Sequence, residues 1–520
     1  MGSIPDDLLG PDVELIETHI SWVFRHPDVV YKVKKPVDYG FLDFSSRRRR
    51  LRACHAEVRL NRRLAPNTYR GVVPITRGED GVHRIGGDGP VVDHAVAMER
   101  LPDADRLDIR LEEGRLDADQ VEDVARFLAA FHADCATSPE ISDLGRMPTV
   151  RANVVENLRQ TRASIARFVP PAAAAELQRA QLRFLDDKAD RIAARADDGF
   201  VREGHGDLRL EHVYLADDGG ITVIDCIEFN RRFRCGDVCA DVAFLSMDLG
   251  AQHRVDLAEV FLAAYAEAAQ DLDLYALVDF YEGYRAWVRA KVATFLADDA
   301  GAPLAVREAS AAKARHFYLL ALSTQRRPAI PPVLVAVGGV LATGKSTIAA
   351  GLRQRLGSPV IGTDRTRKHL LGVAATERVF DGEWQGAYTV DMTDRTYQEV
   401  FRRAGAVLRS GRPVVVDASF RSAAVRAGVR GVAAAEDVPF LFVECRCDPE
   451  TSRDRLRERE KGPSVSDGRL EIFDNFVASF ETVSELPAAQ HLVVDTDAPL
   501  DRALDTIVGR LPAWPAALTG

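Results

Sequence analysis

The sequence predicts an α+β N-terminal domain of two lobes, residues 1–327, followed by an α/β domain with a parallel sheet, residues 328–520. A chain of 520 residues is too long to fold around one hydrophobic core. Residues 326–332 contain three prolines, which exclude a helix and are typical of a stiff linker. Strand-like runs and then helices precede this linker, whereas strands and helices alternate after it, and such alternation indicates a parallel sheet covered by helices.

The first lobe is expected to contain most of the N-terminal strands, because β-branched and aromatic residues dominate several short runs before residue 101. These runs are residues 20–24, 29–33, 72–76 and 91–99. One basic helix is expected over residues 45–64. Side chains alternate along the second run, so Lys32 and Lys34 are expected on the same face.

The second lobe is expected to be helical around one small hairpin. The predicted helices are residues 118–133, 152–167, 172–196, 256–269 and 274–297. The hairpin strands, residues 213–215 and 221–224, follow a loop that carries Asp207 and His212, and Asp225 ends the second strand. This order brings Asp207, His212 and Asp225 around one small space. It suits phosphoryl transfer, because one carboxylate accepts a hydroxyl proton while the other groups hold Mg²⁺.

After the linker, a buried strand at residues 333–337 leads into the pattern G-x-x-x-x-G-K-S. Glycines let successive N–H groups surround a phosphate, and the helix that starts near Gly344 adds its positive end. Lys345 is expected to reach the β- and γ-phosphates, and the Ser346 hydroxyl to bind Mg²⁺. The residues predicted to bind the nucleotide here are Gly339, Thr343, Gly344, Lys345, Ser346 and Thr347.

Two carboxylates follow later strands of this second domain. Asp364 ends the next strand, and Arg367 projects into the same crevice if a helix begins there; helix capping is the alternative role of Asp364. Asp417 ends another buried strand, at the sheet edge where open α/β sheets bind ligands, and is a candidate to orient Mg²⁺ or the acceptor. On a later basic helix, Arg455 and Arg459 are expected to close on the triphosphate as a lid, although a solvated helix would carry the same residues.

Residues 204–230 resemble the aminoglycoside phosphotransferase family and its choline-kinase-like relatives, which implies a bilobal, kinase-like N-terminal domain. The resemblance implies that Asp207 is the catalytic base and that Asp225 is the main Mg²⁺ ligand. It also implies that a strand lysine, Lys32 in preference to Lys34, binds the nucleotide with Glu57 as its helix partner.

The N-terminal pattern departs from that family at three points. His212 replaces the usual Asn, so it is a candidate metal ligand of a softer kind; Arg209 occupies a slot that is often His. Residues 14–30 contain no glycine-rich loop. Glu228 is a candidate extra ligand or, equally, a partner in a surface salt bridge, and Asp241 is expected to brace a loop or cap a helix.

The pair Asp364 and Arg367 resembles the phage-type polynucleotide 5′-hydroxyl kinases and the zeta-toxin-like small P-loop kinases. In such P-loop kinases, a carboxylate at this place takes the proton of the acceptor.

Bulk properties narrow the class of protein. A net charge of −10 argues against nonspecific binding of nucleic acid. No apolar run is long enough to span a bilayer, and the N-terminus lacks the features of a signal peptide, so a cytoplasmic location is expected. The seven cysteines form no C-x-x-C pair and are expected to be reduced.

We therefore predict an ATP- and Mg²⁺-dependent phosphotransferase with two sites, each transferring the γ-phosphoryl group to a hydroxyl of a small-molecule acceptor. Two alternatives are a nucleotide-sensing regulatory protein with one degenerate kinase half, and a polynucleotide 5′-hydroxyl kinase. The expected ligands are ATP, Mg²⁺ and small-molecule acceptors, without a membrane or nucleic-acid partner. The oligomeric state is left open.

Overall fold

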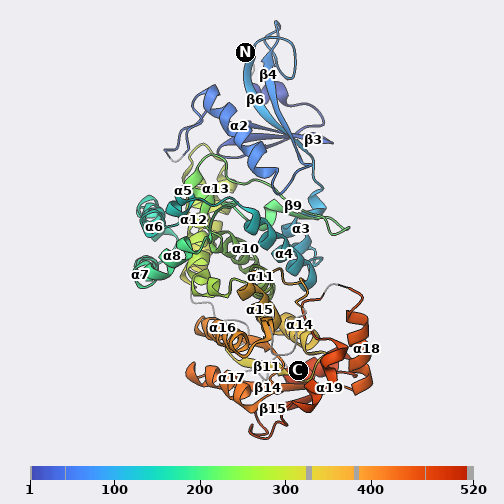
Figure 1. Ribbon diagram of the computed structural model, residues 1–520. Helices are drawn as coiled ribbons and strands as arrows, with labels where there is room; N and C mark the ends of the chain where they lie inside the picture. Colours follow the sequence, from blue (N-terminus) through green and yellow to red (C-terminus); the bar gives the residue numbers. More distant parts are fainter. Residues whose placement is uncertain (1–2, 41, 324–330, 380–385, 463, 512–520) are drawn as a thin grey trace. The chain divides into compact units, whose positions relative to one another are not determined.

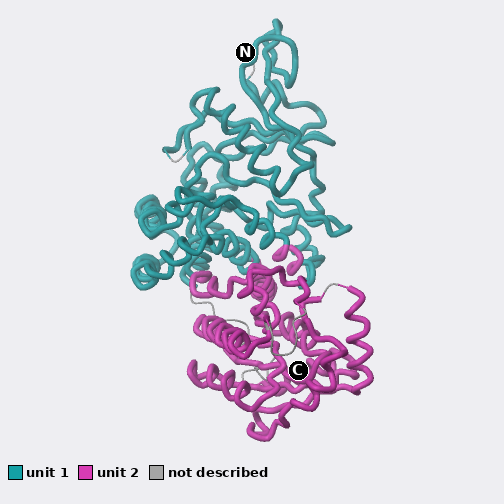
Figure 2. The backbone as a smooth tube through the Cα atoms, viewed as in Figure 1, with its two compact units in different colours: residues 1–120, 127–251, 280–323 teal, residues 121–126, 252–279, 324–520 magenta. Residues whose placement is uncertain are grey.

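The computed structural model describes residues 3–40, 42–323, 331–379, 386–462 and 464–511 (Figure 1). The chain forms two compact units (Figure 2). Unit 1 contains residues 1–120, 127–251 and 280–323, and unit 2 contains residues 121–126, 252–279 and 324–520. Most of the predicted linker, residues 326–332, lies outside the described residues, and the boundary after residue 327 stays a prediction.

Unit 1 contains a six-stranded antiparallel sheet in the order β1-β2-β3-β6-β4-β5. Its strands are β1 (Glu14–Glu17), β2 (Ser21–Arg25), β3 (Val29–Lys34), β4 (Tyr69–Arg77), β5 (His83–Ile85) and β6 (Val91–Glu99). The helix α2 (Arg47–Asn61) packs on β4 and β6, where Cys54, Tyr69 and Val96 are buried together. The four predicted strands and the basic helix are therefore present. The short strands β1 and β5 were not predicted, because neither has a buried face that would produce a clear pattern.

The rest of unit 1 is mainly helical. Its helices are α1 (Ile4–Leu8), α3 (Leu107–Glu112), α4 (Ala118–Asp134), α5 (Pro139–Leu144), α6 (Met147–Thr161), α7 (Pro171–Asp187), α8 (Ala189–Asp197), α9 (Arg231–Arg234), α10 (Cys239–Ala251), α12 (Val278–Asp298) and α13 (Leu304–Leu322), with short parts of α4 and α12 counted in unit 2. Two small antiparallel pairs join β7 (Val201–Glu203) with β10 (Cys235–Asp237), and β8 (Val213–Leu215) with β9 (Ile221–Val223). The single helix predicted over residues 172–196 is wrong, because the chain breaks at Lys188 into α7 and α8. Two aspartates in the last turn of α7 oppose its dipole and favour that break.

Unit 2 is built on a five-stranded parallel sheet in the order β12-β13-β11-β14-β15. Its strands are β11 (Leu334–Gly338), β12 (Val360–Gly362), β13 (Val414–Asp417), β14 (Phe440–Arg446) and β15 (His491–Asp495). Its helices are α11 (Val255–Ala269), α14 (Lys345–Leu356), α15 (Thr363–Leu371), α16 (Val390–Arg409), α17 (Ala423–Ala435), α18 (Pro449–Arg459), α19 (Phe473–Ala478) and α20 (Leu500–Val508). One core cluster joins Val335, Ile348, Val443 and Leu504, so α14 and α20 pack on the sheet.

Buried ion pairs hold two earlier stretches of the chain within unit 2. Arg412, whose side chain is 1% exposed, donates hydrogen bonds to Glu259 (2.7 Å) and Asp279 (2.8 Å). Arg353 donates to Glu122 at 2.8 Å. Residues that precede the linker by more than forty positions are therefore part of the electrostatic structure of this unit.

Three observations, on disulfides, membrane spans and metal ligands, limit the kinds of site that the described residues can form. All seven cysteines are free thiols, as predicted. In the described part of the chain, no helix has both the length and the apolar character needed to cross a bilayer. Within the same described residues, no three His, Cys, Asp or Glu side chains gather as a metal-binding group. A metal ion here would need ligands from a substrate, as Mg²⁺ commonly has.

Candidate active sites

The first candidate site is the loop after β7, which carries Asp207. Gly206 has a φ of +88°, and a Cβ there would lie 2.7 Å from the carbonyl oxygen of Phe233, so only glycine fits. The buried carboxylate of Asp241 accepts hydrogen bonds from the backbone N–H groups of His205 (2.7 Å) and Gly206 (2.8 Å). Asp241 therefore braces the loop, as expected, while the Asp207 side chain stays 28% exposed.

Asp207, His212 and Asp225 lie around one small space, as the hairpin predicted. His212 Nδ1 donates to the Asp207 carbonyl oxygen (2.8 Å), and His212 Nε2 lies 3.7 Å from Asp225 Oδ2. Arg209 adds a contact that was not foreseen: it donates to His212 Nε2 (2.9 Å) and to Asp207 Oδ2 (3.1 Å). The imidazole nitrogen that a metal would need is thus occupied, so we omit His212 from the metal site proposed below.

Two lysines on β3 share one glutamate of α2. Lys32 Nζ lies 3.0 Å from Glu57 and also forms an ion pair with Asp225. Lys34 pairs with the same Glu57 and with Glu228, and its side chain is fully buried. Lys32 is the one beside Asp225, which agrees with the preference for it. The expectation of a surface salt bridge for Glu228 is wrong, because its side chain is only 4% exposed and its partner is buried.

The charges of this cluster stabilise one another. Burial opposes the charged form of Lys32, but Asp225 and Glu57 overcome it and raise the pKa of Lys32 well above its usual range. Burial likewise opposes the Asp225 carboxylate, and Lys32 reverses the effect and lowers the pKa of Asp225. At neutral pH the site therefore presents an ammonium beside an ionised carboxylate, which are the charges needed to hold a phosphate and a divalent cation.

The second candidate site is the phosphate-binding loop of unit 2. Gly339 has a φ of +139°, and a Cβ there would lie 2.5 Å from the carbonyl oxygen of Cys445. Gly344 has a φ of +80° and precedes α14, which begins at Lys345 as predicted. Lys345 Nζ donates to the carbonyl oxygen of Val340 at 2.6 Å, and burial lowers the pKa of this lysine. The loop thus has the backbone curl that an anion nest requires.

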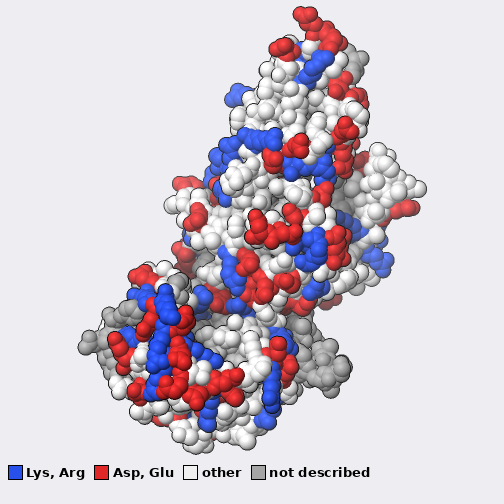
Figure 3. Space-filling model, turned by 90° about the vertical axis from the view of Figure 1, so that its right-hand side faces the viewer, with Lys and Arg blue, Asp and Glu red and all other residues white. Residues whose placement is uncertain are grey.

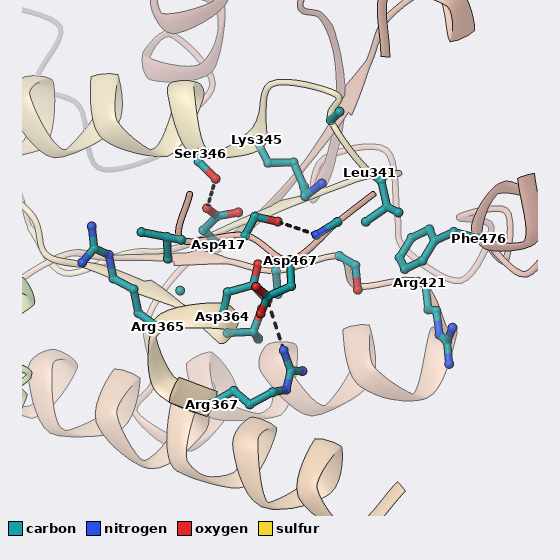
Figure 4. A pocket seen from close by; sticks show the side chains of 18 of the residues that line it. Leu341, Lys345, Ser346, Asp364, Arg365, Arg367, Asp417, Arg421, Asp467 and Phe476 are labelled. Carbon is teal, nitrogen blue, oxygen red and sulfur yellow. Dashed lines mark hydrogen bonds and ion pairs between the residues drawn. The ribbon is translucent and has the colours of Figure 1, made fainter. Parts of the chain in front are cut away.

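A cavity of about 700 Å³ opens beside this loop (Figure 4). Gly344, Lys345, Ser346 and Thr347 line it, whereas Gly339 and Thr343 shape the loop without lining the cavity. At its wall, Ser346 Oγ donates to Asp417 Oδ2 at 2.7 Å, and burial raises the pKa of Asp417. A hydroxyl and a carboxylate oxygen at this distance are hard ligands of the kind that Mg²⁺ prefers.

The carboxylate of Asp364 faces the same cavity from the first turn of α15 (Figure 4). Arg367, one turn later, donates to Asp364 Oδ1 at 3.1 Å and stacks on the Tyr388 ring, 4.7 Å from its centre. Asp364 makes no capping hydrogen bond, and Gly362 occupies the N-cap position. The capping alternative is therefore wrong, and Asp364 and Arg367 come together as the spacing predicted.

The two lid arginines have different positions. Arg459 lines the cavity. Arg455 is outside the cavity lining and donates instead to the carbonyl oxygens of Thr496 (3.0 Å) and Ala342 (3.4 Å). Arg455 thus braces the phosphate-binding loop from behind, and the expectation that it faces the triphosphate is wrong. Its partners lie far away in sequence, which is why the helix alone could not separate the two roles.

A network that the sequence did not reveal joins the segment after α18 to α15. We call it the Lys368 clamp, and it consists of Lys368, Asp467 and Tyr388. Lys368 donates to the carbonyl oxygen of Val465 (2.8 Å) and pairs with Asp467 (3.2 Å), which also accepts from the Tyr388 hydroxyl (2.8 Å). The Lys368 and Asp467 side chains are 1% and 4% exposed. A lysine in an otherwise Arg-rich chain was the available signal.

Two known protein families match different parts of this chain. The phosphotransferase enzyme family matches residues 4–309, and an AAA domain family matches residues 334–483. Uncharacterized proteins of Mycobacterium tuberculosis (Rv2004c) and Mycobacterium bovis (Mb2027c) are each 34% identical to this chain over 464 residues, which cover 87% of this chain and 88% of the relative.

Two solved structures are similar to parts of this chain. A GDP complex of aminoglycoside 2′-phosphotransferase-IIIa is 14% identical, covers 60% of this chain and 94% of that chain, and has a TM-score of 0.38. A sugar kinase from Janibacter sp. HTCC2649 is 18% identical, covers 36% of this chain and 98% of that chain, and has a TM-score of 0.27.

The chain belongs to the phosphotransferase enzyme family. It combines a bilobal, kinase-like N-terminal domain with a C-terminal P-loop domain of the α/β class. Both parts are of kinds that act on nucleotides and small molecules.

Proposed function

We propose that the protein is an ATP- and Mg²⁺-dependent phosphotransferase with two sites, each of which transfers the γ-phosphoryl group to a hydroxyl of a small-molecule acceptor. The N-terminal site belongs to residues 1–327 and the C-terminal site to residues 328–520. One observation carries the proposal: each site brings two carboxylates together with a lysine, Lys32 in the first and Lys345 in the second. This combination supplies a base, a cation for the phosphates and an oxygen ligand for Mg²⁺.

In the N-terminal site, Asp207 accepts the proton of the acceptor hydroxyl. Lys32 holds the phosphates of the nucleotide, and Glu57 fixes the position of its ammonium group through the 3.0 Å ion pair. Asp225 would hold Mg²⁺, which would neutralise part of the phosphate charge.

In the C-terminal site, Asp364 accepts the proton of the acceptor and Arg367 orients its carboxylate. Lys345 and the N-terminus of α14 hold the phosphates, while Arg459 approaches them from the lid. Ser346 and Asp417 hold Mg²⁺ through a hydroxyl and a carboxylate oxygen 2.7 Å apart. Positioning and charge stabilisation account for most catalysis in such reactions, so little further chemistry is asked of the chain.

A mass-spectrometric screen of the full-length protein tests this proposal. Wild type, Asp207→Asn and Lys345→Ala are incubated with a metabolite extract, ATP and Mg²⁺, and species that gain a phosphoryl group are identified. Asp187→Asn and Lys188→Ala are matched controls, because both positions are exposed and belong to neither proposed site. Two sets of products, lost separately in the two site variants and kept in both controls, are expected. Phosphorylation that neither variant reduces would refute the assignment of both sites.

A second candidate is a regulatory protein whose N-terminal half binds nucleotide without turnover. The observation in its favour is that Arg209 donates to Asp207 Oδ2 and so competes for the proposed base. Products lost only with Lys345→Ala would make this reading the leading one. The third candidate, a polynucleotide 5′-hydroxyl kinase, has less support, because basic and acidic side chains are interspersed on the face drawn in Figure 3.

A further inference from the structure

Three cationic side chains of unit 1 are close enough to influence one another electrostatically. Arg209 precedes the short 3₁₀ turn Leu210–His212, Arg289 comes from α12, and Lys313 comes from α13. Arg209 and Arg289 both approach the carboxylate of Glu211. Arg209 Nη1 donates to Glu211 Oε1, and Arg289 Nη1 lies 3.7 Å from the same oxygen.

Arg289 is incompletely paired in this cluster. Its Nη1 atom is buried, yet it donates no hydrogen bond to another described residue. Its nearest carboxylates are Glu211, at 3.7 Å, and Asp248, whose Oδ1 is 4.0 Å away and whose Oδ2 already accepts from the backbone of Leu210. A buried guanidinium donor without an acceptor is costly, so this position favours an additional anion.

The cations of the cluster oppose one another's charge. Burial and the neighbouring Arg209 lower the pKa of Arg289, and burial and Arg289 lower the pKa of Lys313. Burial opposes ionisation of Glu211, but Arg209 overcomes it and lowers its pKa to about 2. Glu211 is thus fully charged, yet neither it nor Asp248 comes within hydrogen-bond distance of Arg289 Nη1.

The cluster is also open to solvent on the side of the proposed base. Lys313 is exposed, and the side chains of Glu211 and Asp207 are 40% and 28% exposed. A purely structural role would account for Arg289, which packs on Phe317 with 4.9 Å to the ring centre. It would not account for Lys313, whose ammonium is exposed and interacts electrostatically with Arg289 and Arg209.

We propose that the acceptor of the N-terminal site carries an anionic group, a phosphate or a carboxylate, which Arg289 and Lys313 bind while the acceptor hydroxyl faces Asp207. The inference rests on the proposed function of that site, because it places the anion on the molecule that is phosphorylated.

Phosphate binding tests the anion site without requiring turnover. Inorganic phosphate is titrated into full-length protein with Lys345→Ala, saturated with Mg²⁺ and a non-hydrolysable ATP analogue so that the nucleotide phosphates are already in place. Saturable binding is expected, and Arg289→Gln and Lys313→Gln should each weaken it about tenfold, the usual loss for one charge-assisted hydrogen bond. Lys188→Gln, an exposed lysine at the start of α8, is the matched control and should leave binding unchanged.

Unchanged phosphate affinity in Lys313→Gln would overturn the inference, and this result is decisive because an exposed lysine is not needed for folding. Competition by acetate distinguishes a carboxylate site from one that prefers phosphate. In the metabolite screen, acceptors lost with Asp207→Asn should be anions before phosphorylation, and neutral or cationic acceptors would also overturn the inference. If Asp207→Asn removes no product while Arg289→Gln still weakens phosphate binding, the proposed function fails and the anion site stands.

Discussion

Replacement of Lys368 by methionine should destabilise unit 2 by about 3 kcal/mol. Removing one partner of a buried ion pair typically costs about 3–5 kcal/mol, because the other charge stays buried without compensation. We expect the lower end of that range. Asp467 keeps hydrogen bonds from the Tyr388 hydroxyl (2.8 Å) and the Val379 amide (3.3 Å), which still stabilise its carboxylate.

Peptide-resolved hydrogen exchange in a denaturant series measures this loss in the full-length protein. The most protected amides of β11 report the free energy of global unfolding of the unit. Lys461→Met is the matched control: its side chain is 69% exposed and pairs with Glu458 on the surface, so its effect should stay within about 0.5 kcal/mol. The double variant Lys368→Met/Asp467→Asn should recover part of the loss, because a neutral amide needs no counter-charge. Equal stabilities of Lys368→Met and Lys461→Met would refute the reasoning.

Three further perturbations have defined outcomes. Asp241→Asn should cost about 2 kcal/mol, since two backbone donors lose a charged acceptor, and thermal denaturation of unit 1 measures it. Gly339→Ala should weaken binding of a fluorescent ATP analogue at least tenfold, because the new Cβ meets the Cys445 carbonyl oxygen at 2.5 Å; Gly431→Ala, which meets nothing within 4 Å, is its control. Burial lowers the pKa of His205 to about 4, below the value of about 6.5 for an unfolded histidine. The unfolded chain therefore binds the extra proton first, and about 3 kcal/mol of stability should be lost as pH falls from about 6.5 to 4.

Each outcome has a clear contradiction. Normal nucleotide affinity in Gly339→Ala would mean that nucleotide binding does not require the backbone conformation of Gly339. Unchanged stability of Asp241→Asn would mean that Asp241 does not stabilise the loop that carries Asp207. For His205, the comparison is with His205→Gln, which cannot titrate in this range; identical pH profiles of the two proteins would show that other groups control the acid transition.

Local patterns account for what could be predicted from the sequence. The phosphate-binding loop and the Asp207–Asp225 hairpin are short, so spacing alone brings their side chains together. Alternation along β3 placed Lys32 and Lys34 on one face, and Glu57 joins both. These features depend on neighbouring residues, which the sequence displays directly.

Pairings between distant residues were the part that the sequence did not reveal. Lys368 and Asp467 are 99 positions apart in the sequence, and nothing local marks either as buried. Arg455 and Arg459 lie one turn apart on α18, yet only the packing around them decides which faces the cavity. Glutamate is usually exposed, so the sequence suggested a surface position for Glu228. Its pairing with the buried Lys34 places it in the interior instead.

The origin of the acidic partners in unit 2 has a practical consequence. The carboxylates that neutralise Arg412 and Arg353 belong to Glu259, Asp279 and Glu122, all encoded well before the linker. A gene fragment that starts at the linker would lack these carboxylates, so both arginines would lose their ion-pair partners. The chain cannot therefore be divided at the linker into two independently folding domains. Recombination there would separate Arg353 and Arg412 from the carboxylates that pair with them. A C-terminal half expressed in isolation would need substitutions at both arginines.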